Sequence, residues 1–289
     1  MTNPDERLLA WALLSRAALA SPDTVRTLLA AHGPLGAAER ITAEGVHSRF
    51  GPQTRVMAEN DLERADRVGA RLLTRDDPGW PLALADLDTI DASTPIALWT
   101  RGPAQLNVLT EQAVAIVGAR ASTPYGEKVS RYVGMDLAAQ GWTIVSGGAF
   151  GIDATAHAAA LEAGQPTVAV LPCGLHRRFP QGNAGLLAEV EKTGLLVSEY
   201  PPGVEPNRNL FLGRNRIVAA LATGIVVCES GIRSGTANTV RWGNKLRRPV
   251  MAVPGPVDSA ASSGCHQFIR TGHARLVTNA HDVLDLLKH

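Results

Sequence analysis

A short segment rich in arginine could bind a nucleic acid. It reads PPGVEPNRNLFLGRNRIVAALA, and between Arg208 and Arg216 it holds three arginines, two asparagines and one phenylalanine. Only 4% of all residues are aromatic, so a phenylalanine among arginines suggests a base stacked on Phe211 beside phosphates neutralised by Arg208 and Arg214. In the alternative interpretation Phe211 fills the core and Arg216 pairs with a neighbouring acid.

The turn GARASTPYG, which starts at Gly118, could bind a phosphate. Thr123 can cap the next helix with Pro124 in its first turn, which leaves backbone N–H groups free near Arg120. A helix start beside one guanidinium suits an anion. Alternatively, Arg120 pairs with a surface carboxylate. The turn lacks the glycine spacing of a dinucleotide fingerprint, so we expect no NAD and no other cofactor.

Two further turns could bind anions through backbone N–H groups. SGGAFGID contains Ser146, Gly147 and Gly148, whose successive amides could form an anion nest. ESGIRSG places Ser234 and Gly235 at another helix start. Together with the arginine-rich segment, these turns predict a site for phosphates and bases.

The acidic and imidazole side chains near these turns are expected to be structural. Asp153 and His157 are four residues apart and share a helix face, and hydrogen bonds within the fold are the usual reason for such a pair; acid–base catalysis is the alternative. Glu229 follows a strand and is expected to orient Arg120 or Arg216, because a lone carboxylate repels phosphate. We therefore predict no catalytic residue and no metal ligands.

These turns follow six apolar segments that alternate with helical patterns. The alternation predicts an α/β fold, a Rossmann-like doubly wound and mostly parallel sheet covered on both faces. The carboxyl ends of parallel strands share one edge, where ligands bind. We expect the following residues to lie together at that edge: Gly118, Arg120, Ser146, Gly147, Gly148, Glu199, Glu229, Gly235 and Gly255.

The first part of the chain has a different pattern. Residues 1–68 predict a small all-helical domain, with Ser21 as an N-cap before Pro22, and residues 69–289 predict the Rossmann-like domain. Between the two patterns, apolar runs around Leu72, Leu84 and Ile96 to Trp99 are expected to be strands that join the sheet.

Composition narrows the class of protein. The 289 residues are 45% hydrophobic with a net charge of +1, so nucleic-acid binding must come from a local basic patch. No apolar stretch approaches the ~20 residues that cross a bilayer, so we expect no membrane contact. Cys173, Cys228 and Cys265 are far apart and form no CxxC pair, which favours a reducing cytoplasm over a zinc site or disulfides.

Taken in order, the turns resemble the DNA-processing protein A (DprA/Smf) family. GARASTPYG is similar to the family's GSR-x-x-T-x-YG turn, and SGGAFGIDATAH to its SG-x-A-x-GID-x-x-AH segment. LFLGRNRIVAAL is similar to its F-x-x-RNRIIA segment, and SEYPPG, SGTANT and AVPG continue the series. The resemblance covers residues from about 70 to 280.

This resemblance implies a single-stranded DNA-binding protein. It implies a homodimer that hands the strand to the RecA recombinase during natural transformation, without catalysis. Carried over by motif, Arg120 contacts phosphate, Arg208 is the basic residue before the helix and Phe211 stacks on a base. The same pocket takes in Ser146, Gly147 and Asn215. The helical region stands where many members have a sterile-alpha-motif-like domain, and we expect no winged-helix domain after His289.

An enzyme is the alternative function. Nucleotide phosphoribohydrolases of the lysine-decarboxylase-like family also use glycine-rich turns on a Rossmann-like sheet. They carry a PGG-x-GT-x-x-E segment, whereas ESGIRSGTANTVRW lacks the glutamate after GT that would act at the ribosyl centre. The sequence therefore favours DNA binding.

Overall fold

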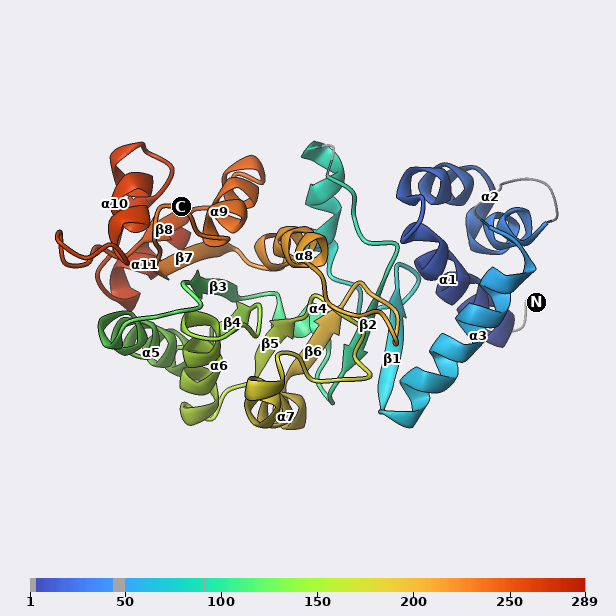
Figure 1. Cartoon of the computed structure of the whole chain (residues 1–289), viewed down its shortest axis with the longest axis horizontal. Coiled ribbons are helices and arrows are strands. Elements are labelled where there is room, and N and C mark those ends of the chain that lie inside the picture. Colours follow the sequence, from blue (N-terminus) through green and yellow to red (C-terminus); the bar gives the residue numbers. More distant parts are fainter. Residues whose placement is uncertain (1–3, 44–49, 91, 289) are drawn as a thin grey trace.

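A nine-stranded sheet organises most of the chain, in the order β1-β2-β6-β5-β4-β3-β7-β8-β9 (Figure 1). The computed structural model describes residues 4–43, 50–90 and 92–288. The strands are β1 (Ala70–Thr74), β2 (Ala97–Arg101), β3 (Ala113–Gly118), β4 (Thr143–Ser146), β5 (Thr167–Val170), β6 (Leu195–Ser198), β7 (Gly224–Glu229), β8 (Val250–Ala252) and β9 (Arg275–Leu276). Strands β3 to β9 pair in parallel, and β1 and β2 extend the sheet beyond β6 in antiparallel pairing. The predicted α/β fold with a mostly parallel sheet is confirmed.

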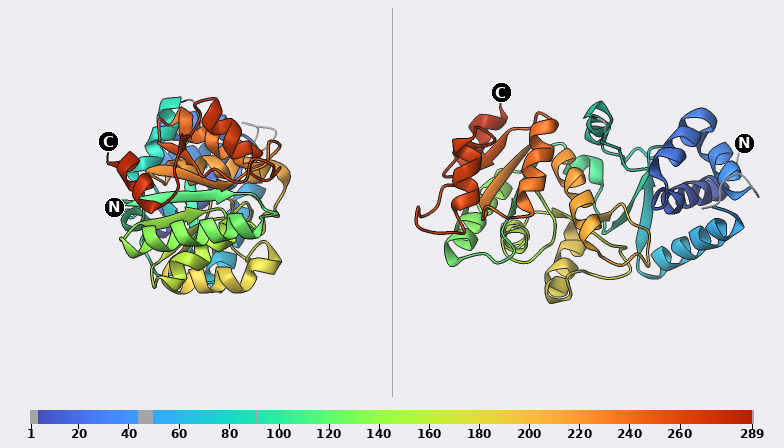
Figure 2. Two further views of the ribbon diagram at one scale, coloured as in Figure 1. Left: turned by 90° about the vertical axis from the view of Figure 1, so that its left-hand side faces the viewer. Right: turned by 45° about the horizontal axis from the view of Figure 1, so that its top comes forward.

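Helices cover both faces of the sheet (Figure 2). They are α4 (Leu106–Leu109), α5 (Pro124–Ala139), α6 (Ile152–Glu162), α7 (Ala184–Thr193), α8 (Arg208–Ala220), α9 (Thr236–Lys245), α10 (Ser263–Arg270) and α11 (Ala280–Leu287), with 3₁₀ helices η1 (Leu82–Ile90) and η2 (Gln181–Asn183). One apolar cluster joins η1, α4, α8 and α9 to one face, and another joins α5, α6 and α11 to the opposite face. Strands β3 to β8 are therefore buried on both sides, apart from the last residue of β3, and consist largely of alanine, valine, leucine and isoleucine.

The strand order contains a reversal that positions the candidate site. From β3 the chain proceeds to β4, β5 and β6 on one side, and then returns to place β7 and β8 on the other side of β3. In open parallel sheets, the crevice at the carboxyl ends of the strands where the order reverses is the usual ligand site. Here it lies between the turns that follow β3 and β7.

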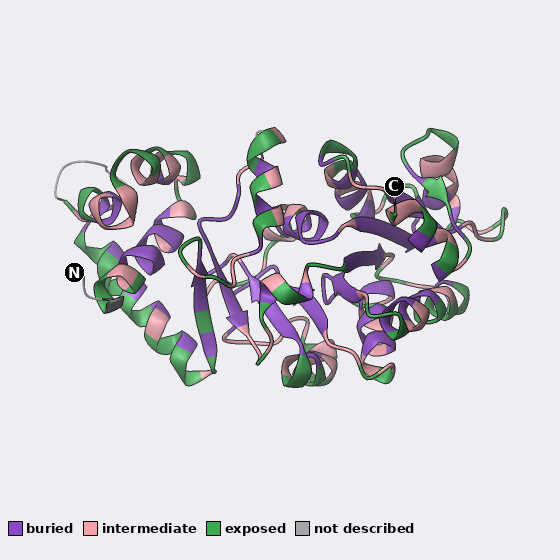
Figure 3. Cartoon of the chain, turned by 180° about the vertical axis from the view of Figure 1, so that it is seen from behind, coloured by how far each residue is buried: buried purple, intermediate pink, exposed green. Residues whose placement is uncertain are grey.

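Three helices precede the sheet. They are α1 (Pro4–Ala18), α2 (Pro22–Thr42) and α3 (Pro52–Arg67), and α2 is kinked at Gly33, where φ is +67°. These helices share one apolar cluster with the sheet, in which Trp11 of α1 and Trp99 of β2 are both buried. The helical content is as predicted, and a domain boundary after residue 68 stays a prediction. Figure 3 shows the buried strands and the exposed outer turns of these helices.

One of the predicted strands is wrong. Leu84 lies in the 3₁₀ helix η1 and not in a strand, whereas Leu72 lies in β1 and Trp99 in β2. Leu84 and Leu87 are three residues apart and both fully buried, a spacing that suits the three residues per turn of a 3₁₀ helix and not the alternation of a strand. None of the helices in the described residues is both long and apolar enough to cross a membrane.

Candidate nucleic-acid interface

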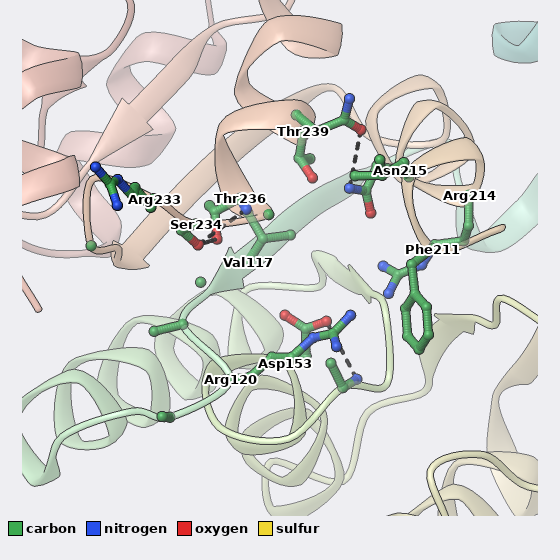
Figure 4. Close-up of a pocket in the computed structure, with 18 of the residues that line it drawn as sticks. Val117, Arg120, Asp153, Phe211, Arg214, Asn215, Arg233, Ser234, Thr236 and Thr239 are labelled. Atoms are coloured by element: carbon green, nitrogen blue, oxygen red, sulfur yellow. Dashed lines mark hydrogen bonds between the residues drawn. The ribbon is translucent and has the colours of Figure 1, made fainter. Parts of the chain in front are cut away.

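A cavity of about 850 Å³ opens at the reversal point of the sheet (Figure 4). Its walls are the turns after β3 and β7, the start of α6, and the facing sides of α8 and α9. Eight predicted site residues line it: Gly118, Arg120, Arg208, Phe211, Arg214, Asn215, Ser234 and Gly235. Their convergence from separate turns is as expected for residues at one sheet edge.

The cavity is strongly basic. Its lining includes Arg233 and Arg241 besides the three predicted arginines, and Asp153 is the sole acidic residue among the described residues that line it. The chain as a whole carries a charge of only +1, so the positive electrostatic field is confined to this cavity. A concave surface strengthens such a field. Sequence reasoning did not select Arg241. The signal for it was the spacing of Asn238 and Arg241, three residues apart on the helix after ESGIRSG.

Arg120 and Phe211 contact each other across the cavity. The Cζ atom of Arg120 lies 4.3 Å from the centroid of the Phe211 ring, which is a cation–π contact. A second ring, that of Phe179, lies 5.9 Å away at an interplanar angle of 60°. Phe211 is half-buried and lines the cavity from the first turn of α8, so it does not simply fill the core. The side chains assigned to phosphate and to base are thus direct neighbours.

Arg214 forms the floor of the cavity, and its position requires that residue 147 has no side chain. A Cβ atom at Gly147 would lie 1.7 Å from Nη1 of Arg214, so the guanidinium packs directly on that backbone. Arg214 is only 5% exposed, and its burial lowers the pKa of the guanidinium, while the nearby Asp153 opposes this change. A larger residue at position 147 would displace the arginine.

The predicted anion nest is not open to the cavity. Ser146, Gly147 and Gly148 are buried and do not line it. The amide of Gly147 donates to Asp153 Oδ2 at 3.1 Å, and Ser146 Oγ donates to the carbonyl of Ile116 at 2.6 Å. The prediction of a nest failed because Asp153, six residues beyond Gly147, already accepts the amide of that glycine. The three residues support the floor instead of forming the wall.

Glu229 does not orient an arginine as predicted. Its carboxylate is buried and accepts hydrogen bonds from the backbone N and the Oγ1 of Thr123, at 2.8 and 2.6 Å. Thr123 is the N-cap of α5, as predicted, with Pro124 at the first helical position and Gly126 N donating to Thr123 Oγ1. The negative charge favoured at the start of α5 is therefore supplied by the protein itself.

Glu199 and Gly255 lie away from the cavity, contrary to the expected convergence, and so does Arg216. Glu199 and Arg216 form a bidentate ion pair, in which Nη2 and Nη1 of Arg216 donate to Oε1 and Oε2 of Glu199 at 2.6 and 2.8 Å. The pair lies beside a second cavity of about 420 Å³. Arg216 faces away because it lies two residues from Arg214, on the opposite side of α8. The alternative interpretation of Arg216, a pair with a neighbouring acid, is confirmed. Gly255 contacts the imidazole of His266 instead.

His157 and Asp153 are structural residues, as expected. Nδ1 of His157 lies 2.8 Å from Oγ1 of Thr167, which donates to the carbonyl of Ile144. The imidazole is fully buried, and burial with the positive charge of Arg214 lowers its pKa to about 3. Burial raises the pKa of Asp153. In the described residues, no group of three or more His, Cys, Asp or Glu could hold a metal ion.

Comparison with known proteins gives the family. The model of the family described as DNA recombination-mediator protein A matches residues 71–288. The chain belongs to this family. A relative from Mycobacterium tuberculosis that carries the DprA name is 44% identical over 301 residues, covering 100% of this chain and 77% of the relative. DNA processing protein DprA of Streptococcus pneumoniae is 40% identical over 190 residues, or 66% of either chain.

Two solved structures of DNA processing protein A are similar to this chain. The X-ray structure of the Streptococcus pneumoniae protein has a TM-score of 0.70 and 33% identity, covering 81% of this chain and 82% of that chain. The Helicobacter pylori protein, whose structure is described for its single-stranded DNA binding mode, has a TM-score of 0.67 and 28% identity, covering 76% of this chain and 95% of that chain. This chain therefore shares the fold of DNA processing protein A.

Proposed function

We propose that this protein binds single-stranded DNA in the 850 Å³ cavity. The observation that carries the proposal is the Arg120–Phe211 contact of 4.3 Å inside a cavity lined by five arginines. Arginine neutralises phosphates, and a phenylalanine ring stacks on any base whose face is free. In a duplex, base faces are covered by their neighbours, so a stacking ring favours the single strand.

Different residues have different roles in this proposal. Arg120, Arg208 and Arg214 neutralise phosphates, Phe211 stacks on a base, and Asn215 contributes polar contacts from α8. Gly118, Ser234 and Gly235 let the strand approach the backbone of the two turns. Ser146, Gly147 and Gly148 act through Arg214, which lies directly on Gly147.

The family supports the wider biological part of the proposal. We propose that the protein acts as a homodimer in the cytoplasm, protects incoming single strands and delivers them to RecA during natural transformation. Support comes from membership of the recombination-mediator family over residues 71–288 and from the single-stranded DNA binding described for the Helicobacter pylori relative.

We propose binding without catalysis. Asp153 accepts the backbone amides of Gly147 and Ala149 and lies beside Arg214, which commits its carboxylate to the fold. A phosphoribohydrolase needs an acidic group free to act at the ribosyl centre. Incubation with nucleoside monophosphates should therefore release no base.

The test is a titration of a fluorescent oligonucleotide, single-stranded and as a duplex, with the wild type and Phe211→Ala. We expect the wild type to prefer the single strand and Phe211→Ala to lose that preference while its thermal unfolding midpoint stays unchanged. Equal and weak binding of both forms by the wild type would contradict the proposal and favour a small nucleotide as the ligand.

A further inference from the structure

A second phenylalanine is exposed next to the cavity. Phe150 is 48% exposed and follows Ala149, which lines the cavity, in the loop between β4 and α6. Aromatic rings of this size are usually well buried, because each removes a large apolar area from water. An exposed ring at the edge of a basic cavity therefore needs an explanation.

We propose that Phe150 is a second base-stacking platform, which holds a nucleotide further along the strand whose other base stacks on Phe211. The proposal rests on single-stranded DNA binding in the cavity. Its ligand is an unpaired base of any sequence, since every base has a π-face. Phe150 would thus extend the site from one stacked base to two.

One short segment links the two rings. At its start, the ring of Phe179 lies 5.9 Å from that of Phe211. At its end, Gly182 is in contact with Phe150, because a Cβ atom there would lie 2.8 Å from the ring. Three residue steps separate Phe179 from Gly182, a span of at most about 11 Å. The separation of the Phe211 and Phe150 rings adds the ring contact at one end and the Gly182 contact at the other to this backbone span. A few nucleotides bridge such a separation, because even stacked bases advance by about 3.4 Å each.

The loop that carries Phe150 is held on both sides. On one side, Ile152 N donates to the carbonyl of Ala119, next to Arg120, at 3.2 Å. On the other, Asn183 Nδ2 donates to the carbonyl of Gly148 at 3.0 Å. A ring on a fixed loop loses little conformational freedom when it binds, so its contact area is converted efficiently into affinity.

Glycines on either side of the ring explain its outward position. Gly148 and Gly151 have φ values of +66° and +74°, a left-handed conformation that favours glycine. A Cβ atom at Gly151 would lie 2.4 Å from the carbonyl oxygen of Ala119. The backbone therefore turns sharply at both ends, and Phe150 lies between the turn that carries Arg120 and the helix η2.

The experiment moves a single abasic nucleotide along a thymidine oligonucleotide and measures affinity at each position. For the wild type we expect two sensitive positions. Phe150→Ala should abolish the sensitivity at one of them, and Phe211→Ala at the other. With the intact oligonucleotide, Phe150→Ala should weaken binding by about fivefold to a hundredfold, Phe150→Trp should bind like the wild type, and Phe150→Leu should bind like Phe150→Ala.

The matched control is Tyr132→Ala, which removes an aromatic ring that is 54% exposed on α5 and should leave both sensitive positions. An unchanged abasic profile in Phe150→Ala would overturn the second platform, as would a profile weakened equally at every position. If the wild type shows one sensitive position that only Phe211→Ala removes, this inference fails and the proposed function stands. If the wild type binds no single strand, both fail.

Discussion

Neutralising Arg208 should reduce the salt dependence of DNA binding by one phosphate contact. Arg208 is exposed at the first position of α8, lines the cavity and takes part in no ion pair among the described residues. Arg208→Ala removes its charge without uncovering a buried partner, so the fold should be unaffected. The change therefore isolates one electrostatic contribution to binding.

The magnitude follows from the number of arginines. Each phosphate neutralised on a single strand contributes about 0.7 to the slope of log K against log salt concentration. With Arg120, Arg208 and Arg214 engaging phosphates, the slope is about −2.1, and affinity falls about twentyfold between 50 and 200 mM salt. Arg208→Ala should make the slope about 0.7 less steep.

The assay is fluorescence anisotropy with a labelled thymidine oligonucleotide at four or more salt concentrations. Phe211→Ala should weaken binding by about 1–3 kcal/mol while keeping the slope close to that of the wild type, because stacking releases no counterions. Arg40→Ala, at an exposed position on α2, is the control for loss of a distant charge. A slope that is identical in Arg208→Ala and the wild type would refute the assignment of Arg208 to a phosphate.

Three further predictions concern the support of the cavity. Gly147→Ala should displace Arg214 and destabilise the fold by about 1–3 kcal/mol. The control is Gly185→Ala, which should be neutral or stabilising because a Cβ atom there meets nothing within 4 Å. Chemical denaturation measures the unfolding free energy of both variants, and equal values would contradict the role of Gly147. His157 has a pKa of about 3 in the fold and about 6.5 when unfolded, so its contribution to stability is full above pH 6.5 and is lost as the pH falls toward 3, by up to about 1.4 kcal/mol per pH unit. His157→Gln should flatten the dependence of the unfolding free energy on pH in this range. An unchanged dependence would show that His157 is not responsible. Glu229→Gln removes the charge at the start of α5 and should cost about 1–3 kcal/mol in urea denaturation; a cost near zero would mean that the carboxylate contributes nothing as a cap.

Local patterns predicted the sheet and much of the cavity wall. Apolar segments followed by small-residue turns located β3 to β8, and the rule that ligands bind at the carboxyl edge was enough to assign Arg120 and Phe211 to one pocket from the sequence alone. Thr123 was predicted as a cap from its position before a proline. Each of these inferences starts from a short local pattern, and the shared strand edge is what relates Arg120 to Phe211.

Most of the missed features depend on residues that are distant in sequence. Glu229 caps a helix through Thr123, which is 106 residues away, and no local pattern indicates which strand end will face which helix start. The predicted nest at Gly147 is the exception, because the residue that accepts its amide, Asp153, is only six residues away. Arg241 shares a helix face with Asn238, but the sequence does not show that the packing of α9 beside α8 turns this face toward the cavity. Pairing partners on different elements therefore required the three-dimensional structure.

The apolar cluster that joins the N-terminal helices to the sheet crosses the boundary at which the family model begins. The family model begins at residue 71, inside β1, but Trp99 of β2 and Leu72 of β1 are covered by α1 and its neighbours. A protein trimmed to the matched residues would expose these side chains to water as an apolar patch, which favours self-association. The segment that the family model matches is thus shorter than the segment that keeps the apolar flank of the sheet covered.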